Sequence, residues 1–326
     1  MPTFCRHNRL VQNCPICSRE QAVELRPIVS SGTPRVSAPR PTRGAGAARS
    51  ASGSRSRSGL RVSQLARGAD DGYHSRLVPG LKSSADAERL AEDLALAAAR
   101  LERLTIDPPG LYSEVGGTGD IEERTWLAFL IAYLCPLESE DPFASIERVR
   151  TPWAGGAEPD LDGAELGPRT AHEASRGTRT LDAYRLWAGR ASSQAAAFGG
   201  EEAWTPERRF ARVYERLALP GLHRDARFDL LVTLGRLGVY ELRAGALQFG
   251  GDNEVTVAAK RALGIGDSLL LERRAAELAD QCGLELEALD LGLYNWGTGD
   301  RVTGGLGPDA EADEAVLSAV RAALGL

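Results

Sequence analysis

Residues 217–265 read LALPGLHRDARFDLLVTLGRLGVYELRAGALQFGGDNEVTVAAKRALGI, and they place the turn Leu219-Pro220-Gly221 between two helical patterns. Pro and Gly are the strongest turn signals in a sequence. A short turn between helices is typical of a helix-hairpin-helix, expected here near residues 213–235. Such a turn directs backbone N–H groups at the start of the second helix outward, where they can bind a phosphate. The alternative is an ordinary connection between two helices.

Apolar residues recur at helical spacing through most of the remaining chain. The stretches with this pattern are 85–104, 121–137, 181–198, 205–217, 254–264, 268–283, 285–297 and 309–326. Thr205 followed by Pro206 is a good helix start, while Gly264 and Gly283 are helix stops. No series of strands with alternating polarity is evident, so we predict an all-α body.

Composition and charge are uneven along the 326 residues. Residues 1–67 hold twelve Arg and two Glu, a net charge of +10, whereas the remainder holds 27 basic and 43 acidic residues, a net charge of −16. A basic arm favours contact with a polyanion. No apolar run reaches the ~18 residues of a membrane span, and no signal-peptide pattern opens the chain, so we expect a cytoplasmic protein without membrane contact.

The sequence predicts three segments. Residues 1–25 form a small head, residues 26–59 an Arg-, Ser-, Pro- and Gly-rich disordered linker, and residues 60–326 the helical domain. The linker has seven Arg and no acidic residue, so it is either a plain tether or one that also contacts DNA phosphates.

The head has a metal-binding pattern. Cys5, His7, Cys14 and Cys17 provide four sulfur and nitrogen ligands, the number that a structural Zn²⁺ site uses. A head this short cannot bury a core, so the metal would supply its folding free energy. A redox CxxC is the alternative, but no βαβ pattern surrounds it. Cys135 and Cys282 lie in apolar patterns and are expected to be core residues.

The region from about 85 to 300 resembles the helix-hairpin-helix DNA glycosylase superfamily. The resemblance rests on Leu219-Pro220-Gly221, on the later segment GDNEVTVAAKRALG (251–264) and on LIAYLCPLE (130–138). It implies that Asp252 is the catalytic aspartate, and that Glu138 stands where the family has a Gln that reaches into the duplex gap. The family's second hairpin Gly is His223 here.

The position of the lyase Lys in bifunctional family members is Asp225 here, so no Schiff base can form there. The resemblance therefore implies a monofunctional glycosylase, a hydrolase that cleaves the N-glycosidic bond and leaves an abasic site. Positive charge develops on the sugar as this bond breaks, and a fixed carboxylate stabilises that charge. The alternative for Asp252 is an N-cap of the helix that follows.

The closest resemblance within the superfamily is to the alpha-glutamyl/putrescinyl thymine pyrophosphorylase-like group. It rests on the Cys-x-His-Asn-Arg head, on AYLCPLESEDPF (132–143) and on LYNWG (293–297). The resemblance implies action on hypermodified or glycosylated bases in phage DNA, and hence a role in antiviral defence. Two alternatives remain: a non-catalytic DNA-binding module, and a pyrophosphorylase or transferase that modifies the base in place.

Further candidate residues follow from these hypotheses. Arg224 and His223, beside the turn, are candidate phosphate contacts, and Lys260, in the segment after Asp252, is a candidate DNA-binding residue. A base flipped out of the duplex needs an aromatic pocket. Tyr294 and Trp296 are candidates for it. Tyr133 is another, although Trp126, Phe129 and Tyr133 also have the spacing of core residues.

Overall fold

The computed structural model describes residues 68–307 and 311–326, all of them within the unit Leu60–Leu326. This part of the chain is built from helices and loops, without strands, which confirms the all-α prediction. None of its helices is long and apolar enough to cross a membrane. The predicted zinc head and linker lie outside the described residues.

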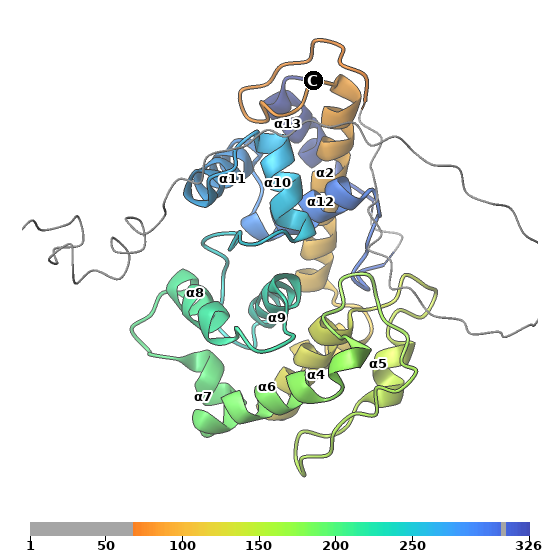
Figure 1. Ribbon diagram of the computed structural model, residues 1–326, viewed down its shortest axis with the longest axis vertical. Coiled ribbons are helices and arrows are strands. Elements are labelled where there is room, and N and C mark those ends of the chain that lie inside the picture. Colours follow the sequence, from red (N-terminus) through yellow and green to blue (C-terminus); the bar gives the residue numbers. More distant parts are fainter. Residues whose placement is uncertain (1–67, 308–310) are drawn as a thin grey trace, which may run out of the picture. The chain divides into compact units, whose positions relative to one another are not determined.

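Helices from both ends of the described chain form one group, which we call the terminal lobe. Its members are α2 (Ser84–Ile106), α10 (Glu254–Leu263), α11 (Ser268–Cys282), α12 (Leu286–Thr298) and α13 (Glu314–Leu324). The long helix α2 packs against α12 and α13, and α12 packs in turn against α10 (Figure 1). Leu90 and Leu94 of α2 are fully buried in this group, as the apolar stripe over 85–104 predicts.

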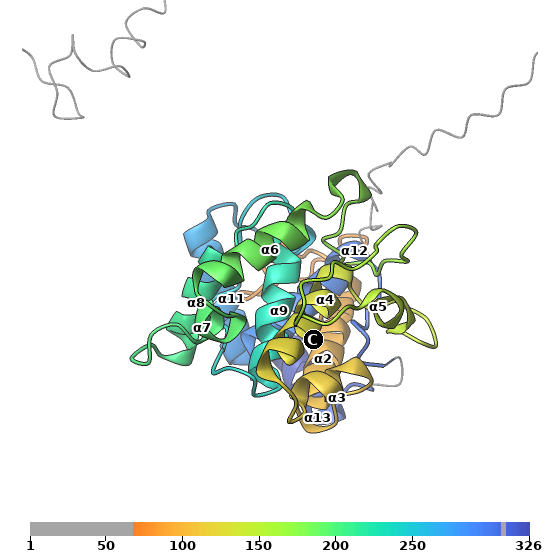
Figure 2. The same ribbon diagram turned by 90° about the horizontal axis from the view of Figure 1, so that it is seen from below.

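The middle of the chain forms a second group, the central lobe. It contains α3 (Leu111–Gly116), α4 (Ile121–Leu134), α5 (Ala144–Val149), the 3₁₀ helix η2 (Ala174–Arg176), α6 (Arg179–Arg190), α7 (Gln194–Gly199), α8 (Pro206–Arg216) and α9 (Arg224–Arg236). The apolar helix α4 packs against α9 at the centre of this group (Figure 2). The chain thus enters the central lobe from α2 and returns to the terminal lobe through residues 237–253.

Local signals set most helix ends. The Thr205 side chain accepts a hydrogen bond from the Arg208 N–H at the start of α8, with Pro206 as the first helical residue. Gly264 and Gly283 end α10 and α11 in the left-handed conformation, as the sequence predicts.

Two parts of the central lobe differ from the sequence-based expectation. The stretch 181–198 forms two helices, because the chain turns at Ser192, which has a positive φ of 76°. The helices α3 and α5 were not predicted, since six residues are too few to show a helical repeat.

The aromatic residues of α4 are core residues. Trp126, Phe129 and Tyr133 have exposed fractions of at most 1%. The Phe129 ring stacks on Tyr184 of α6 with centroids 3.8 Å apart. This stack confirms the core interpretation of their spacing and joins α4 to α6 within the central lobe.

The cysteines Cys135 and Cys282 are buried and unpaired, as predicted for core residues. Burial raises the pKa of Cys135 to about 12 and that of Cys282 to about 11, so neither thiol is ionised at neutral pH. Cys135 also has a positive φ of 60°, where α4 ends before Pro136.

Candidate functional site

The segment of the predicted hairpin is a short turn that connects α8 to α9. Pro220 and Gly221 occupy its centre, Gly221 has a φ of +81°, and the Leu222 N–H donates to the Leu219 carbonyl oxygen at 3.1 Å. Pro followed by a residue with positive φ is the signature of a type II turn. His223 then caps α9 through its backbone, without a side-chain hydrogen bond to the first turn of the helix.

Helix α6 packs against this turn. The Thr180 hydroxyl donates to the Pro220 carbonyl oxygen at 2.9 Å. A Cβ atom at Gly221 would lie 2.3 Å from that hydroxyl oxygen, so a larger residue would force α6 and the turn apart. Gly221 is therefore required both for the turn conformation and for its close approach to α6.

The segment that carries Asp252 is a turn directly before α10. Asn253 is the N-cap of α10: its side-chain oxygen accepts from the Thr256 N–H at 2.9 Å, and its amide nitrogen donates to the Gly250 carbonyl oxygen at 2.6 Å. The N-cap interpretation of Asp252 is therefore wrong by one residue. Asp252 itself is exposed, and its carboxylate makes no hydrogen bond or ion pair to another described residue.

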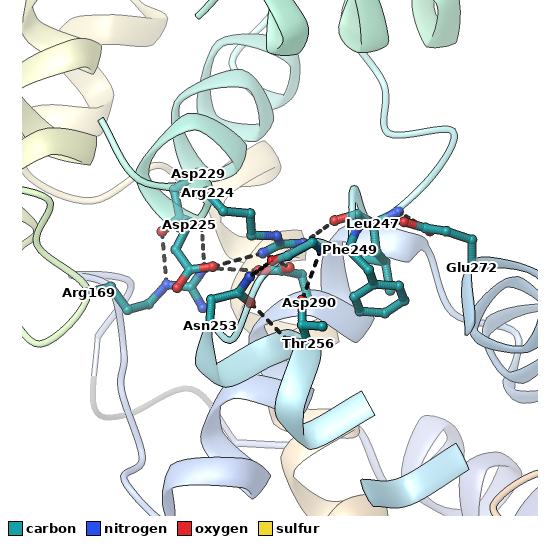
Figure 3. Close-up of polar contacts among 11 residues, drawn as sticks. Arg169, Arg224, Asp225, Asp229, Leu247, Phe249, Asn253, Thr256, Glu272 and Asp290 are labelled. Carbon is teal, nitrogen blue, oxygen red and sulfur yellow. Dashed lines mark hydrogen bonds and ion pairs between the residues drawn. The ribbon is translucent and has the colours of Figure 1, made fainter. Parts of the chain in front are cut away.

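A chain of alternating charges lies where the two lobes meet (Figure 3). Arg169 binds both carboxylate oxygens of Asp229, at 2.9 and 2.8 Å, and donates to Asp290 at 2.9 Å. Arg224 pairs with the other oxygen of Asp290 and, at 3.0 Å, with Asp225. Arg169 and Asp290 are each only 2% exposed, so the centre of the network is buried.

Arg224 also connects the network to the segment before α10. Its guanidinium donates to the Leu247 carbonyl oxygen. From the opposite side, Glu272 of α11 accepts from the Leu247 N–H at 2.8 Å and from the Phe249 N–H at 2.7 Å (Figure 3). Leu247 is thus held between α9 and α11, three residues before Gly250, where the Asp252 turn begins.

A cavity of about 70 Å³ adjoins the network. Its charged wall includes Arg169, Asp229, Asp290 and Glu287, and its apolar wall comes from α2, α4, α9, α12 and the loop 303–306. Asp229 is 36% exposed, whereas Asp290 behind it is nearly inaccessible. Of these two carboxylates, that of Asp229 therefore has the larger exposed fraction.

Burial and the neighbouring opposite charges shift the pKa values of Asp229 and Arg169 in opposite directions. Burial raises the pKa of Asp229 to about 6; the charge of Arg169 opposes the shift, and the carboxylates of Asp290 and Asp225 add to it. Burial alone would lower the pKa of Arg169, but Asp229 and Asp290 outweigh it and hold that pKa well above its usual value. Strongly shifted groups beside a cavity are typical of functional sites.

The three predicted pocket aromatics lie in different surroundings. Tyr294 is 6% exposed and lies under the Arg169 guanidinium, 4.6 Å from the ring centroid. Trp296 is 1% exposed, and its indole N–H donates to the Asp86 carbonyl oxygen at 3.0 Å within the terminal lobe. The Tyr133 hydroxyl is 2.9 Å from His172 Nδ1. Of the three, Tyr294 contacts the charge network.

The residues predicted to contact DNA differ in their exposure and in their partners. His223 is half exposed, with Nε2 3.0 Å from Glu173. Arg224 is buried and faces inward, so it ties α9 to the terminal lobe and presents no guanidinium at the surface. Glu138 is exposed and accepts from the Thr303 N–H at 2.8 Å, while Lys260 is half-buried in the last turn of α10. Leu219 is half-buried, Pro220 exposed and Gly221 buried.

Sequence analysis did not identify Arg169, Asp229 or Asp290. Asp290 gave one signal, an acidic residue within the apolar pattern 285–297. Arg169 gave none, because it lies in a loop 121 residues before its partner Asp290. Among the described residues no cluster of His, Cys, Asp and Glu could hold a metal ion, and the predicted ligands Cys5, His7, Cys14 and Cys17 lie outside them.

Comparison of the chain with models of known protein families, with curated proteins and with solved structures finds no match.

Proposed function

We propose that this protein is a monofunctional DNA glycosylase that hydrolyses the N-glycosidic bond of a modified base. The observation that carries the proposal is the link Arg224–Leu247, which joins the start of the hairpin helix α9 to the segment before Asp252. This link would fix the position of the Asp252 carboxylate relative to a DNA phosphate bound at the α8–α9 turn. Cleavage needs the nucleotide to be bound and the carboxylate to be placed against its sugar at the same time.

The Asp252 side chain is exposed, so a bound nucleotide can reach it. Its carboxylate has no partner among the described residues, so it is available to stabilise positive charge on a deoxyribose. It can also orient the attacking water. Asp225, at the position of the lyase amine, pairs with Arg224, so no amine is offered there for a Schiff base. Both observations support hydrolysis that leaves an abasic site.

We further propose that the protein binds DNA and that its substrate is a modified base flipped out of the duplex. Its role would be defence against phages. Phosphate contacts are assigned to His223 and to the first amides of α9. Of the aromatic residues predicted to line a base pocket, Tyr294 is the one that contacts the charge network. A structural zinc ion on Cys5, His7, Cys14 and Cys17 remains part of the proposal.

Replacement of Asp252 by Asn tests the activity. Wild-type protein incubated with DNA from phages that carry modified bases, followed by mild alkali, is expected to give strand breaks. Asp252→Asn should reduce the rate of their formation by about 10²–10³-fold, because it removes the stabilising charge. Asp162→Asn is the matched control, since Asp162 is another exposed acidic residue in a turn.

Other outcomes separate the alternatives. Equal rates for wild type and Asp252→Asn would contradict the role of Asp252. Tight binding of DNA without breaks would identify a DNA-binding module instead. A mass change on a base that stays attached to its sugar would identify an enzyme that modifies the base in place.

A further inference from the structure

Asp290 belongs to the charge network but has no role in the chemistry proposed above. Asp290 lies on α12 in the terminal lobe, whereas both of its arginine partners belong to the central lobe. We propose that Asp290 is a positioning residue, which acts through Arg224 to hold the Asp252 turn in place beside the α8–α9 turn. This inference rests on the proposed glycosylase activity.

The contacts form a continuous path. One carboxylate oxygen of Asp290 accepts from Arg169 at 2.9 Å, and the other pairs with Arg224. Arg224 in turn donates to the Leu247 carbonyl oxygen, and Glu272 holds the Leu247 N–H at 2.8 Å. Leu247 is therefore fixed from both sides, and three residues later the turn of Asp252 begins.

The other two carboxylates cannot fill this role. Asp225 is next to Arg224 in α9, so their ion pair does not fix α9 relative to any other helix. Asp229 lies in α9 as well and contacts Arg169. Within the described network, Asp290 is the carboxylate that joins the two lobes.

Stability alone is a weak explanation for this arrangement. Desolvation of buried charges offsets much of their attraction, and apolar replacements of such networks are often neutral or stabilising. A buried ion pair does, however, require a defined geometry from every residue that contributes to it. Catalysis needs such geometry, since a displacement of about 1 Å can reduce a rate by about 10²-fold.

The test is Asp290→Asn, which keeps the size of the side chain and removes its charge. Amide hydrogen exchange of Leu247, Phe249 and Gly250 is expected to accelerate at least ~10-fold, because Arg224 is no longer held in place. The single-turnover rate on modified DNA should fall by about 10²-fold, with the affinity for unmodified duplex changed less than about twofold. A purely structural role would not separate rate from affinity.

Glu122→Gln is the matched control. Glu122 accepts from the backbone N–H groups of Gln194 and Ala195, at 2.9 and 2.8 Å, and so ties α4 to α7 inside the central lobe. Its loss should leave exchange at residues 247–250 unchanged. Arg224→Lys is the second variant in case Asp290→Asn does not fold: a lysine keeps the charge but cannot bind Asp290 and the Leu247 carbonyl together.

The outcomes are distinguishable. Unchanged exchange at residues 247–250 in the folded variants overturns the positioning role, as does an equal loss of rate and DNA affinity. If wild-type protein releases no base from any modified DNA, the proposed function fails. The exchange measurement then still decides whether Asp290 holds the segment.

Discussion

Asp93 shows how a single buried carboxylate makes the stability of this protein depend on pH. It lies on α2, is 8% exposed, and has no hydrogen-bond or ion-pair partner within 4 Å among the described residues. Burial raises its pKa to about 6; Arg301 opposes the shift and Glu92 adds to it. The ionised form is therefore less favourable in the folded state than in the unfolded chain.

Asp93→Asn is expected to stabilise the protein above pH 7 and to have little effect near pH 4. A carboxyl group with a raised folded-state pKa contributes stability below its unfolded pKa, and this is lost as the pH rises through the folded value of about 6. Removing the charge should raise the free energy of unfolding by about 1–3 kcal/mol at pH 8. Urea denaturation of the variant and the wild type at pH 4 and pH 8 measures this difference in the free energy of unfolding. An equal difference at both pH values would contradict the prediction.

The packing of α12 against α2 in the terminal lobe depends on a glycine. Gly292 of α12 lies against α2: a Cβ atom there would be 2.7 Å from Leu94 Cδ2 and 3.0 Å from Leu94 Cα. Because the second of these atoms belongs to the backbone, α2 would have to move. Gly189 in α6 is also helical, but a Cβ atom there would meet nothing within 4 Å.

Gly292→Ala should therefore destabilise the protein by about 1–3 kcal/mol, as overpacking does. Gly189→Ala should stabilise it by roughly 0.5–1 kcal/mol, because alanine loses less backbone entropy in a helix. Chemical denaturation of both variants at one pH compares the two glycines directly. Destabilisation of similar size in both would show that packing against α2 does not control the effect.

The N-terminal 67 residues and the rest of the chain carry net charges of opposite sign. Residues 1–67 carry a net charge of +10 and the remainder a net charge of −16. If the proposed partner is DNA, the acidic helical body gains little from general electrostatic attraction. The basic arm then supplies much of the attraction that does not depend on base sequence.

Exchanging residues 26–59, the linker within this basic arm, for a Gly/Ser segment of equal length tests the contribution of the linker. Seven Arg are lost, and each phosphate contact contributes ~0.9 to the slope of log K against log salt. We expect weaker DNA binding and a slope shallower by about 1–6, measured by fluorescence anisotropy at several salt concentrations. A slope equal to that of wild type would show that the linker is a tether without phosphate contacts.

Local features of the fold could be predicted from the sequence. The Thr205-Pro206 start, the Gly264 stop and the Pro220-Gly221 turn depend on residues that are neighbours in the chain, so their signals are complete within a few positions. The core role of Trp126 likewise follows from its helical spacing. Such features need no knowledge of the partner helices.

Tertiary structure decided the candidate site. Arg169 and Asp290 are 121 residues apart, and no local pattern indicates that they meet. The sequence predicted Arg224 as a phosphate contact, but in the structure its buried guanidinium pairs with Asp290 of α12. Burial of a charge is stable only where a partner charge from elsewhere in the chain reaches it, and that depends on how the two lobes pack together.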